Sequence, residues 1–235
     1  MKKAVYLISV IAAFLLSACG SGDNQVVKDI DGNTYTVVRI GYQEWLVENL
    51  KVTHYNDGTP IAYAPSTSDW MAADSLKNGA WCVYDFDGDS SNALTANSYV
   101  TNGALYNYYA VKSGKLAPEG WRVATEDDWS LLQAYITYNR WNYDESHSGN
   151  KVAKAMTDSQ YWVDNSDDGV GDIGTKNTYM DKNNISGFSA MPAGDRRTNG
   201  DYVLQGEQTF WWTSTQLEGV DNFAYAKGLS NTEAE

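Results

Sequence analysis

The segment KLAPEGWRVATEDDWSLL, Lys115–Leu132, constrains the fold more than any other part of this sequence. It is polar, yet it carries two tryptophans, whose large apolar rings favour burial. Pro118 and Gly120 predict a turn, and Trp121 and Val123 alternate with charged or small residues as in a short strand. The segment therefore predicts a strand that enters a core.

The second half of the same segment predicts a helix. Thr125 has the features of an N-cap, because Asp128 three residues later completes a capping box. Trp129, Leu132 and Ile136 fall on one face of this helix, which we expect to run to about residue 138. We therefore expect the strand and the helix each to bring a tryptophan to the same core.

Short elements of both kinds are spread over the rest of the chain. Residues 34–40 and 43–46 alternate on either side of Gly41, which predicts a hairpin. Further strands are predicted at 79–84, 187–192, 202–204 and 209–215, and shorter helices at 69–76, 103–111 and 151–156. This pattern predicts an α+β domain with small antiparallel sheets, two main helices and long loops.

The first residues predict export. Lys2 and Lys3 precede the apolar run Ala4–Leu16, and small residues then lead to Cys19. The run is too short to cross a bilayer, which needs about 20 residues. A cysteine directly after Leu-Ser-Ala is typical of a bacterial lipoprotein signal, in which Cys19 is acylated; an ordinary signal peptide is the alternative. We expect three segments: a signal peptide at 1–18, a tether at 19–28 and one domain over 29–235.

The charge of the chain disfavours one class of partner. The sequence has 30 acidic and 17 basic residues, and two of the basic residues lie in the signal. The mature chain therefore has 15 basic residues against 30 acidic ones, a formal charge of about −15. Phosphate backbones are repelled by such a field, so we expect no nucleic-acid partner. Neutral glycans and other proteins fit this charge better.

Cysteine content limits cross-links. If Cys19 is acylated, Cys82 is the one thiol left in the mature sequence, and an intradomain disulfide is excluded. We expect Cys82 to be buried and inert, with a reactive thiol as the alternative.

Several segments of the sequence occur together in one known family. They are DGNTY, IGYQEWLVENLK, GALYNYYAV, LAPEGWRVATEDDWSLL, GFSAMPAGDRR and FWWTST, in this order. The series covers roughly residues 29–225 and resembles the major paralogous domain first described in Fibrobacter lipoproteins and common in gut Bacteroidota. Its closing part also resembles the C-type-lectin-like fold of formylglycine-generating enzymes and of variable ligand-binding proteins diversified by retroelements.

The resemblance implies a C-type-lectin-like domain that displays ligand-binding loops. In lectin-like variable proteins the region around the FWWTST strand forms the exposed binding face. Carried over to this sequence, that face comprises Arg196, Arg197, Asn199, Tyr202, Asn222 and Tyr225. Amides and tyrosines suit adaptable recognition. For Trp211 and Trp212 we expect core positions, because alternation along a strand would bury at least one; the alternative is that they join the ligand face.

One departure from the family concerns the end of the chain. Members usually continue past this strand into a further aromatic strand and a terminal segment that often holds a cysteine, whereas this sequence stops at Glu235. We therefore expect that a final strand is missing and that Cys82 has lost a partner with it. Such a loss would leave a sheet edge open for aggregation or for pairing with another chain.

Catalytic arrangements find little support in the sequence. The formylglycine-generating enzymes use a pair of active-site cysteines, which one mature cysteine besides the lipid anchor cannot supply. His54 and His147, the two histidines, lie in polar segments without a nucleophile motif, so we expect them at the surface. Zinc would need more such ligands. Spacing among the 30 acidic residues does not reveal a glycosidase pair, so a polysaccharide-active enzyme is the last alternative.

One acidic loop has the ligand spacing of a calcium site. Its oxygen-bearing residues stand at relative positions one, three, five and nine: Asp164, Ser166, Asp168 and Asp172. A glycine occupies position six, but Thr175 stands at position twelve, where a bidentate glutamate is expected. Calcium is therefore the one cofactor that we consider, with a solvated loop of Asx turns as the alternative. A second acidic loop at 85–89 has its glycine in the wrong place.

These observations favour a non-catalytic, lipid-anchored protein of the cell envelope. We expect an outer-membrane lipoprotein, exposed at the cell surface, whose lectin-like domain binds an extracellular glycan or protein. The alternative is a structural subunit of a surface appendage or envelope assembly, in which an open sheet edge pairs with a neighbour.

Overall fold

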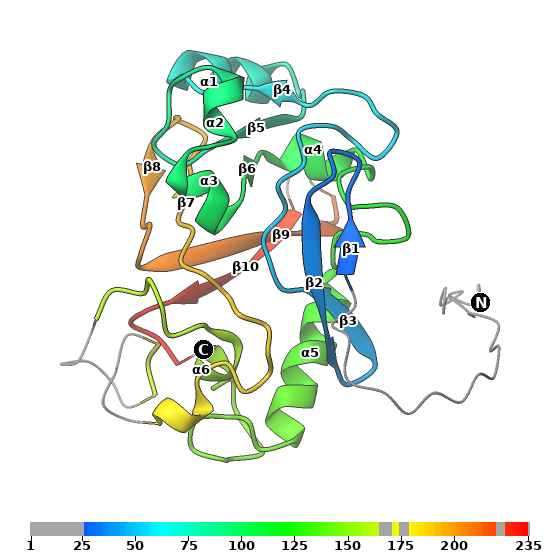
Figure 1. The fold of residues 1–235 in the computed structure, drawn as a ribbon. Coiled ribbons are helices and arrows are strands. Elements are labelled where there is room, and N and C mark those ends of the chain that lie inside the picture. The colour runs from blue at the N-terminus through cyan, green and yellow to red at the C-terminus, as the bar shows by residue number, and fades with distance from the viewer. Residues whose placement is uncertain (1–25, 165–170, 174–178, 220–223, 235) are drawn as a thin grey trace.

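A computed structural model describes residues 26–164, 171–173, 179–219 and 224–234 (Figure 1). Helices and small sheets are mixed along the chain, which confirms the predicted α+β class. The strands of these residues form four small sheets, in the orders β1-β2-β3, β4-β5-β6, β7-β8 and β9-β10. One pairing differs from the expected antiparallel arrangement, because β4 and β5 run parallel. The C-type-lectin-like fold stays a prediction.

The first sheet contains the predicted hairpin with the predicted bounds. Its strands are β1 (Val26–Lys28), β2 (Thr34–Ile40) and β3 (Gln43–Leu46). Gly41 in the turn has φ +65°, and a Cβ there would lie 2.7 Å from Cδ2 of Tyr135. The turn therefore needs glycine both for its backbone conformation and for its close contact with the helix that carries Tyr135.

That helix is α5 (Glu126–Tyr138), and its predicted start and buried face are confirmed. The Thr125 side chain accepts from the Asp128 N–H, and the Asp128 carboxylate accepts from the Thr125 N–H at 2.7 Å. Trp129, Leu132 and Ile136 are buried. The capping box fixes the first turn of α5 and with it the position of Trp129.

The short strand predicted before α5 is wrong. Residues 121–124 form no sheet ladder, and Trp121 is only half-buried. The segment is held by individual contacts instead: the Arg122 guanidinium donates to Asp128 Oδ1 at 2.8 Å, and Ser214 N–H donates to the Ala124 carbonyl at 2.9 Å. Trp121 therefore does not join Trp129 in the core.

The middle of the chain folds into short elements around a second sheet. They are β4 (Ala62–Tyr63), α1 (Thr67–Ser75), β5 (Ala80–Cys82), α2 (Ser90–Ala93), α3 (Asn97–Asn102), β6 (Leu105–Tyr106) and α4 (Tyr108–Lys112). The helix predicted at 69–76 and the strand predicted at 79–84 are confirmed within a few residues. The helix predicted over 103–111 is split, because the Asn107 side chain accepts from the N–H groups of Ala80 and Ala110 and so caps α4.

The last part of the described chain holds two short helices and four strands. They are α6 (Ala153–Met156), the 3-10 helix η1 (Met180–Lys182), β7 (Asp195–Arg196), β8 (Tyr202–Val203), β9 (Gln208–Gln216) and β10 (Ala224–Ser230). The strand predicted at 187–192 is wrong, because Gly187 and Ser189 have positive φ and only Ala190 forms a bridge. A strand, β10, does follow β9, and the loss of a final family strand stays a prediction.

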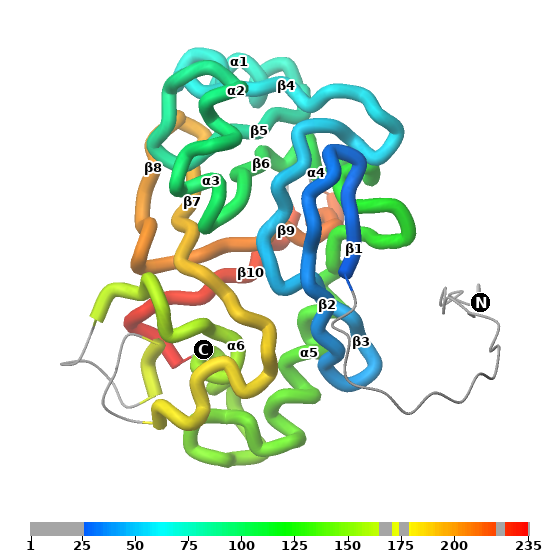
Figure 2. Tube along the Cα trace, in the orientation of Figure 1, coloured from blue at the N-terminus to red at the C-terminus, as the bar shows by residue number. Residues whose placement is uncertain are grey.

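Figure 1 and Figure 2 show β9 and β10 crossing the middle of the molecule, between the part with α1–α4 and the part with α5 and α6. The part with α5 and α6 has its own core, here called the lower core, which contains Trp129, Ile136, Met156 and Leu229. The upper core contains the following buried residues among others: Val52, Trp81, Val83, Tyr99 and Tyr108. No helix within the described ranges is long and apolar enough to cross a membrane.

Candidate ligand-binding cleft

A cleft of about 800 Å³ opens beside β9. Its walls come from the β2–β3 hairpin, the loop at 116–124, the start of α5 and the first half of β9. Ligand pockets typically measure about 300–1,000 Å³, so the space is large enough for a ligand. We call it the aromatic cleft, after its aromatic lining: Tyr42, Trp45, Trp70, Tyr106, Trp121, Trp129, Phe188, Phe210, Trp211 and Trp212.

Six of the nine tryptophans of the sequence line this cleft. Trp129, at the start of α5, is central among them. Its ring centroid lies 5.0 Å from that of Trp45 on β3, 5.3 Å from that of Trp211 on β9 and 5.6 Å from that of Phe188. The capping box that begins α5 therefore also positions the floor of the cleft.

The neighbouring tryptophans of β9 lie on opposite faces of the strand. Trp211 is half-buried, packs on Trp129 and donates its indole N–H to Asn49 Oδ1 at 3.3 Å. Trp212 is 38% exposed and donates its indole N–H to the Tyr106 carbonyl at 3.0 Å. The predicted core position is thus confirmed only in part for Trp211. It is wrong for Trp212, because the ring packs on Tyr108 of α4 at a centroid distance of 5.5 Å but keeps more than a third of its surface exposed.

Four polar atoms on lining residues are buried and have no hydrogen-bond partner in the part of the chain that the structure describes. They are Nε1 of Trp45, Nε1 of Trp129, Oδ1 of Asn102 and Oδ1 of Asp195. A buried polar group without a partner costs about 1–3 kcal/mol. Two donors and two acceptors around an aromatic space are the groups that a polar ligand or bound water satisfies.

Asp195 is the charged member of this group. Burial raises the pKa of its carboxyl, and the nearby Arg197 cation opposes this shift only in part. Three other carboxylates line the cleft. Glu48 accepts from Thr36 N–H at 2.6 Å, Asp128 is held by Arg122 and Thr125, and Glu44 is exposed to solvent. Asp195 is therefore the carboxylate of the cleft with a buried oxygen left to accept a hydrogen bond from a ligand.

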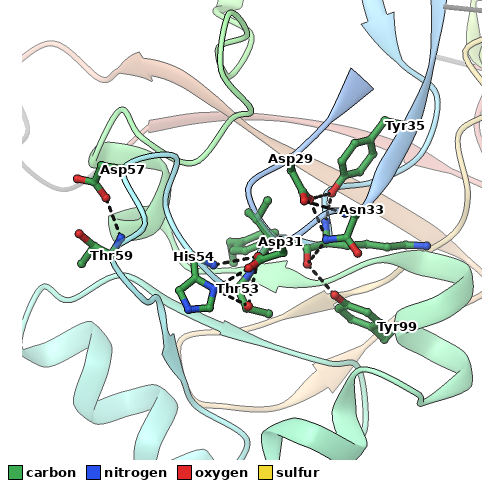
Figure 3. A network of polar contacts seen from close by, with 12 residues as sticks. Asp29, Asp31, Asn33, Tyr35, Thr53, His54, Asp57, Thr59 and Tyr99 are labelled. Carbon is green, nitrogen blue, oxygen red and sulfur yellow. Dashed lines mark hydrogen bonds and ion pairs between the residues drawn. The ribbon is translucent and has the colours of Figure 1, made fainter. Parts of the chain in front are cut away.

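A polar network joins the DGNTY segment to the irregular segment around Lys51 (Figure 3). Asp29 accepts from the Asn33 side chain at 2.8 Å and from the Tyr35 hydroxyl at 2.6 Å, and that hydroxyl accepts from Lys51 N–H at 2.9 Å. Asp31 accepts from Thr53 N–H at 2.6 Å. These carboxylates are satisfied by protein donors, so the network is structural.

His54 lies in this network beside a carboxylate and a hydroxyl, as Figure 3 shows. Its Nδ1 is 2.6 Å from Asp31 Oδ1 and 3.1 Å from Thr53 Oγ1. A catalytic triad needs the acid and the nucleophile on different ring nitrogens, because the proton must pass through the imidazole. Both contacts here use the same nitrogen, so this cluster lacks the geometry of a triad. His147 is exposed and accepts from the Arg140 side chain.

The predicted calcium loop lies only partly within the described residues. Ser166 and Asp168 lie outside them, whereas Asp164 and Asp172 lie inside and Asp172 is buried. Among the residues that the structure describes, no group of three or more His, Cys, Asp or Glu side chains is arranged to hold a metal ion. Calcium at this loop stays a prediction.

Arg196, a predicted ligand residue, lies inside the protein. Its guanidinium donates to the carbonyls of Ala64 at 2.6 Å, Pro65 at 2.9 Å and Gly200 at 3.1 Å, and its Cζ lies 4.4 Å from the ring centroid of Tyr202. The side chain is 9% exposed. Its donors are therefore occupied by the protein itself, which corrects its expected place on an exposed loop face.

The remaining predicted ligand residues do not form one patch. Arg197 and Asn199 are exposed on the loop between β7 and β8, where Trp70 of α1 donates its indole N–H to the Arg197 carbonyl at 3.0 Å. Tyr225, 43% exposed, lies beside the end of β9, about 23 Å along that strand from its start. Asn222 lies outside the described residues. Cys19 does so too, and its acylation stays a prediction.

Cys82 is buried, as predicted. Burial raises the pKa of its thiol, and the neighbouring Arg196 guanidinium acts in the opposite direction. A thiol in this position is protonated at neutral pH and out of reach of solvent, which fits an inert residue.

The sequence did not indicate Trp45, Asn102, Trp129 and Asp195 as a group. These residues come from a strand, a helix end, a helix start and a second strand, and no spacing rule relates them. The one available signal was the abundance of tryptophan, nine in the chain. This abundance predicted a core, and six of the tryptophans also line the cleft, among them the buried Trp70 and Trp129.

The fold and the cleft define an α+β protein with an aromatic cleft, and a comparison with known sequences identifies its family. Residues 38–233 match the family described as the Fibrobacter succinogenes major domain. The chain belongs to this family. No curated protein and no solved structure matches it.

Proposed function

We propose that this protein is a non-catalytic lipoprotein of the cell envelope that binds an extracellular glycan or protein ligand in its aromatic cleft. The observation that carries the proposal is the combination, around one space, of six tryptophans with four buried polar atoms that have no partner among the described residues. Aromatic rings supply large contact areas at low entropic cost, and the polar atoms supply direction. The proposed anchor is a lipid on Cys19 in the outer membrane, with the domain facing outward and without a metal or other cofactor needed for binding.

Ligand binding is tested with glycan arrays and with cell-surface protein extracts, using Trp212→Ala as the cleft variant. Trp212 is exposed, so its loss should leave the fold intact, whereas binding should fall about tenfold or more. Tyr138→Ala is the matched control, because Tyr138 is 78% exposed and lies outside the cleft lining. Equal binding by both variants would remove the cleft from the proposal.

The anchor is tested separately. Mass spectrometry of the protein purified from membranes should find an acylated Cys19 as the first residue, and Cys19→Ser should release the protein from the membrane fraction. An unmodified Cys19 in the wild-type protein would contradict the anchor without affecting the cleft.

A structural subunit is the second candidate, and the edge of β9 favours it, because within the described residues part of this edge has no strand beside it. Gel filtration separates the two candidates. A monomer that still binds ligand supports the receptor, and ordered oligomers that dissociate when the β9 edge is altered support the subunit.

A further inference from the structure

The register of β9 determines which of its backbone groups face the aromatic cleft. β9 and β10 are antiparallel, and Asn231 N–H donates to the Glu207 carbonyl at 2.8 Å. In an antiparallel ladder, residues alternate between facing the partner and facing away from it. The odd-numbered residues of β9 up to Trp211 therefore bond to β10, and the even-numbered residues face away from it.

Two hydrogen bonds on the other side of β9 agree with this alternation. Gly194 N–H donates to the Gln208 carbonyl at 2.8 Å, and Ser214 N–H donates to the Ala124 carbonyl at 2.9 Å. Phe210 and Trp212 lie between these points, and their N–H and C=O groups have no partner among the described residues. Both residues line the cleft. The result is an open edge about 20 Å long that is closed at both ends.

The opposite wall of the cleft has the same property. Val47 N–H donates to the Thr36 carbonyl at 2.9 Å, and Val38 is registered with Trp45. The same alternation leaves the backbone groups of Glu44 and Leu46 facing away from β2. Both of these residues line the cleft. The cleft therefore has an open strand edge on β3 as well as on β9.

The floor of the cleft joins these two strands without a ladder between them. Trp129 packs against Trp45 of β3 and against Trp211 of β9, with ring centroids 5.0 and 5.3 Å apart. Phe188 packs against all three rings. A ligand that covers these rings and bonds to the free backbone groups of Phe210 and Trp212 has to be extended. It also has to present a hydrogen-bond donor and an acceptor at every second position. A polypeptide strand meets both requirements.

We propose that the aromatic cleft binds an extended segment of a partner protein, which adds to the open edge of β9 by backbone hydrogen bonds at Phe210 and Trp212. This inference rests on the proposed function of the cleft as the ligand site. Alternate side chains of the segment that face Trp129 and Phe188 are small or aliphatic. The protein carries a formal charge of −13, and Glu44 and Asp195 line the cleft, so the segment is neutral or basic. That charge also disfavours a second copy of this chain.

The probe for this proposal is a displayed library of random peptides of about 12 residues, long enough to cover the edge. Selection uses the full chain in detergent micelles, and hydrogen exchange then follows single amides. The N–H groups of Phe210 and Trp212 should exchange rapidly in the free protein and become protected at least about tenfold with a selected peptide. A library that yields no peptide with this protection overturns the proposal.

Two substitutions at one position isolate the backbone donor. Phe210→Ala removes the ring and keeps the N–H, whereas Phe210→Pro removes both, at an edge position where the N–H faces away from β10. Peptide affinity should be about tenfold lower for F210P than for F210A, the effect expected for one hydrogen bond. Continued protection of the Trp211 amide confirms that the β9–β10 ladder survives. Equal affinities of the two variants overturn the proposal.

The outcomes also separate this inference from the proposed function. In one outcome, glycans bind to the wild type but not to Trp212→Ala, and no peptide protects the edge of β9. The proposed function then stands, and strand addition is refuted. If peptides and glycans both fail to bind, the two fall together. If peptides bind with equal affinity to F210P and F210A, the cleft is a peptide site that does not use the edge of β9.

Discussion

The ring of Phe210 lies against the backbone of Gly228 on the neighbouring strand. The two residues are directly opposite in the β9–β10 ladder, and a Cβ on Gly228 would stand 2.8 Å from Cδ1 of Phe210. An aromatic ring laid over a cross-strand glycine restores packing that the glycine itself cannot supply. The pair therefore fixes the ring of Phe210 at the rim of the aromatic cleft.

Gly228→Ala should destabilise the protein by about 1–2 kcal/mol, because the new methyl group displaces this ring. In the double variant Gly228→Ala with Phe210→Ala, the ring is absent and most of the added cost should disappear. Urea unfolding of the two single variants and the double variant gives the coupling energy. A coupling near zero would mean that the ring does not rest on Gly228 in solution.

Tyr35→Phe should cost about 2–3 kcal/mol of stability. The Tyr35 hydroxyl donates to Asp29 and accepts from Lys51 N–H, and its removal leaves both groups short of a partner in a buried place. Tyr42→Phe is the control, because Tyr42 is 97% exposed and its hydroxyl should contribute nothing. Chemical denaturation of both variants measures the difference, and similar midpoints would show that the network of Figure 3 carries little stability.

Asp195→Asn should raise the stability of the protein at about pH 7. Burial raises the pKa of Asp195 in the folded state above its unfolded value, so the ionised form is penalised by folding. The penalty is absent below the unfolded pKa, about 3.9, and is complete once the pH exceeds the folded pKa. The gain in melting temperature should thus vanish at about pH 3. Asp87→Asn, at an exposed position, is the control, and an equal gain there would contradict the assignment.

Asp128 should contribute to acid unfolding with the opposite sign. Burial raises the pKa of its carboxyl, but the hydrogen bonds from Arg122 and Thr125 outweigh burial and hold the pKa below its usual range. Its contribution is present above the unfolded pKa of about 3.9 and is lost as the pH falls through the folded value. Urea midpoints measured from about pH 6 down to about pH 3 should fall less steeply in Asp128→Asn than in the wild type. Parallel curves would refute the assignment.

Local signals in the sequence predicted the elements that depend on neighbouring residues. The hairpin around Gly41 and the capping box at Thr125 each depend on a few consecutive residues, and both are confirmed. The strand predicted around Trp121 failed, because a strand needs a partner and residues 121–124 lack one. Similarly, Ser189 adopts a positive φ, which serine rarely does and which the sequence did not predict. This conformation interrupts the strand predicted at 187–192.

The candidate site was predicted far less well than the elements. A resemblance at the end of the chain indicated Arg196, but no local pattern shows that its guanidinium binds the Ala64 carbonyl, 132 residues away. The contact of Trp45 with Trp129 likewise depends on the packing of a hairpin against a helix. Sites assembled from distant segments become visible only when the fold is known.

The buried guanidinium of Arg196 has a consequence for engineering. It donates hydrogen bonds to the carbonyls of Gly200, Ala64 and Pro65, so the short connection between β7 and β8 is held in place by a buried side chain. Thr198 is exposed on this connection and can be exchanged while Arg196 holds the backbone, whereas the Asn199 side chain bonds to Asp201 and helps to shape the turn. The connection is thus a ready place to graft new recognition sequences without rebuilding the domain.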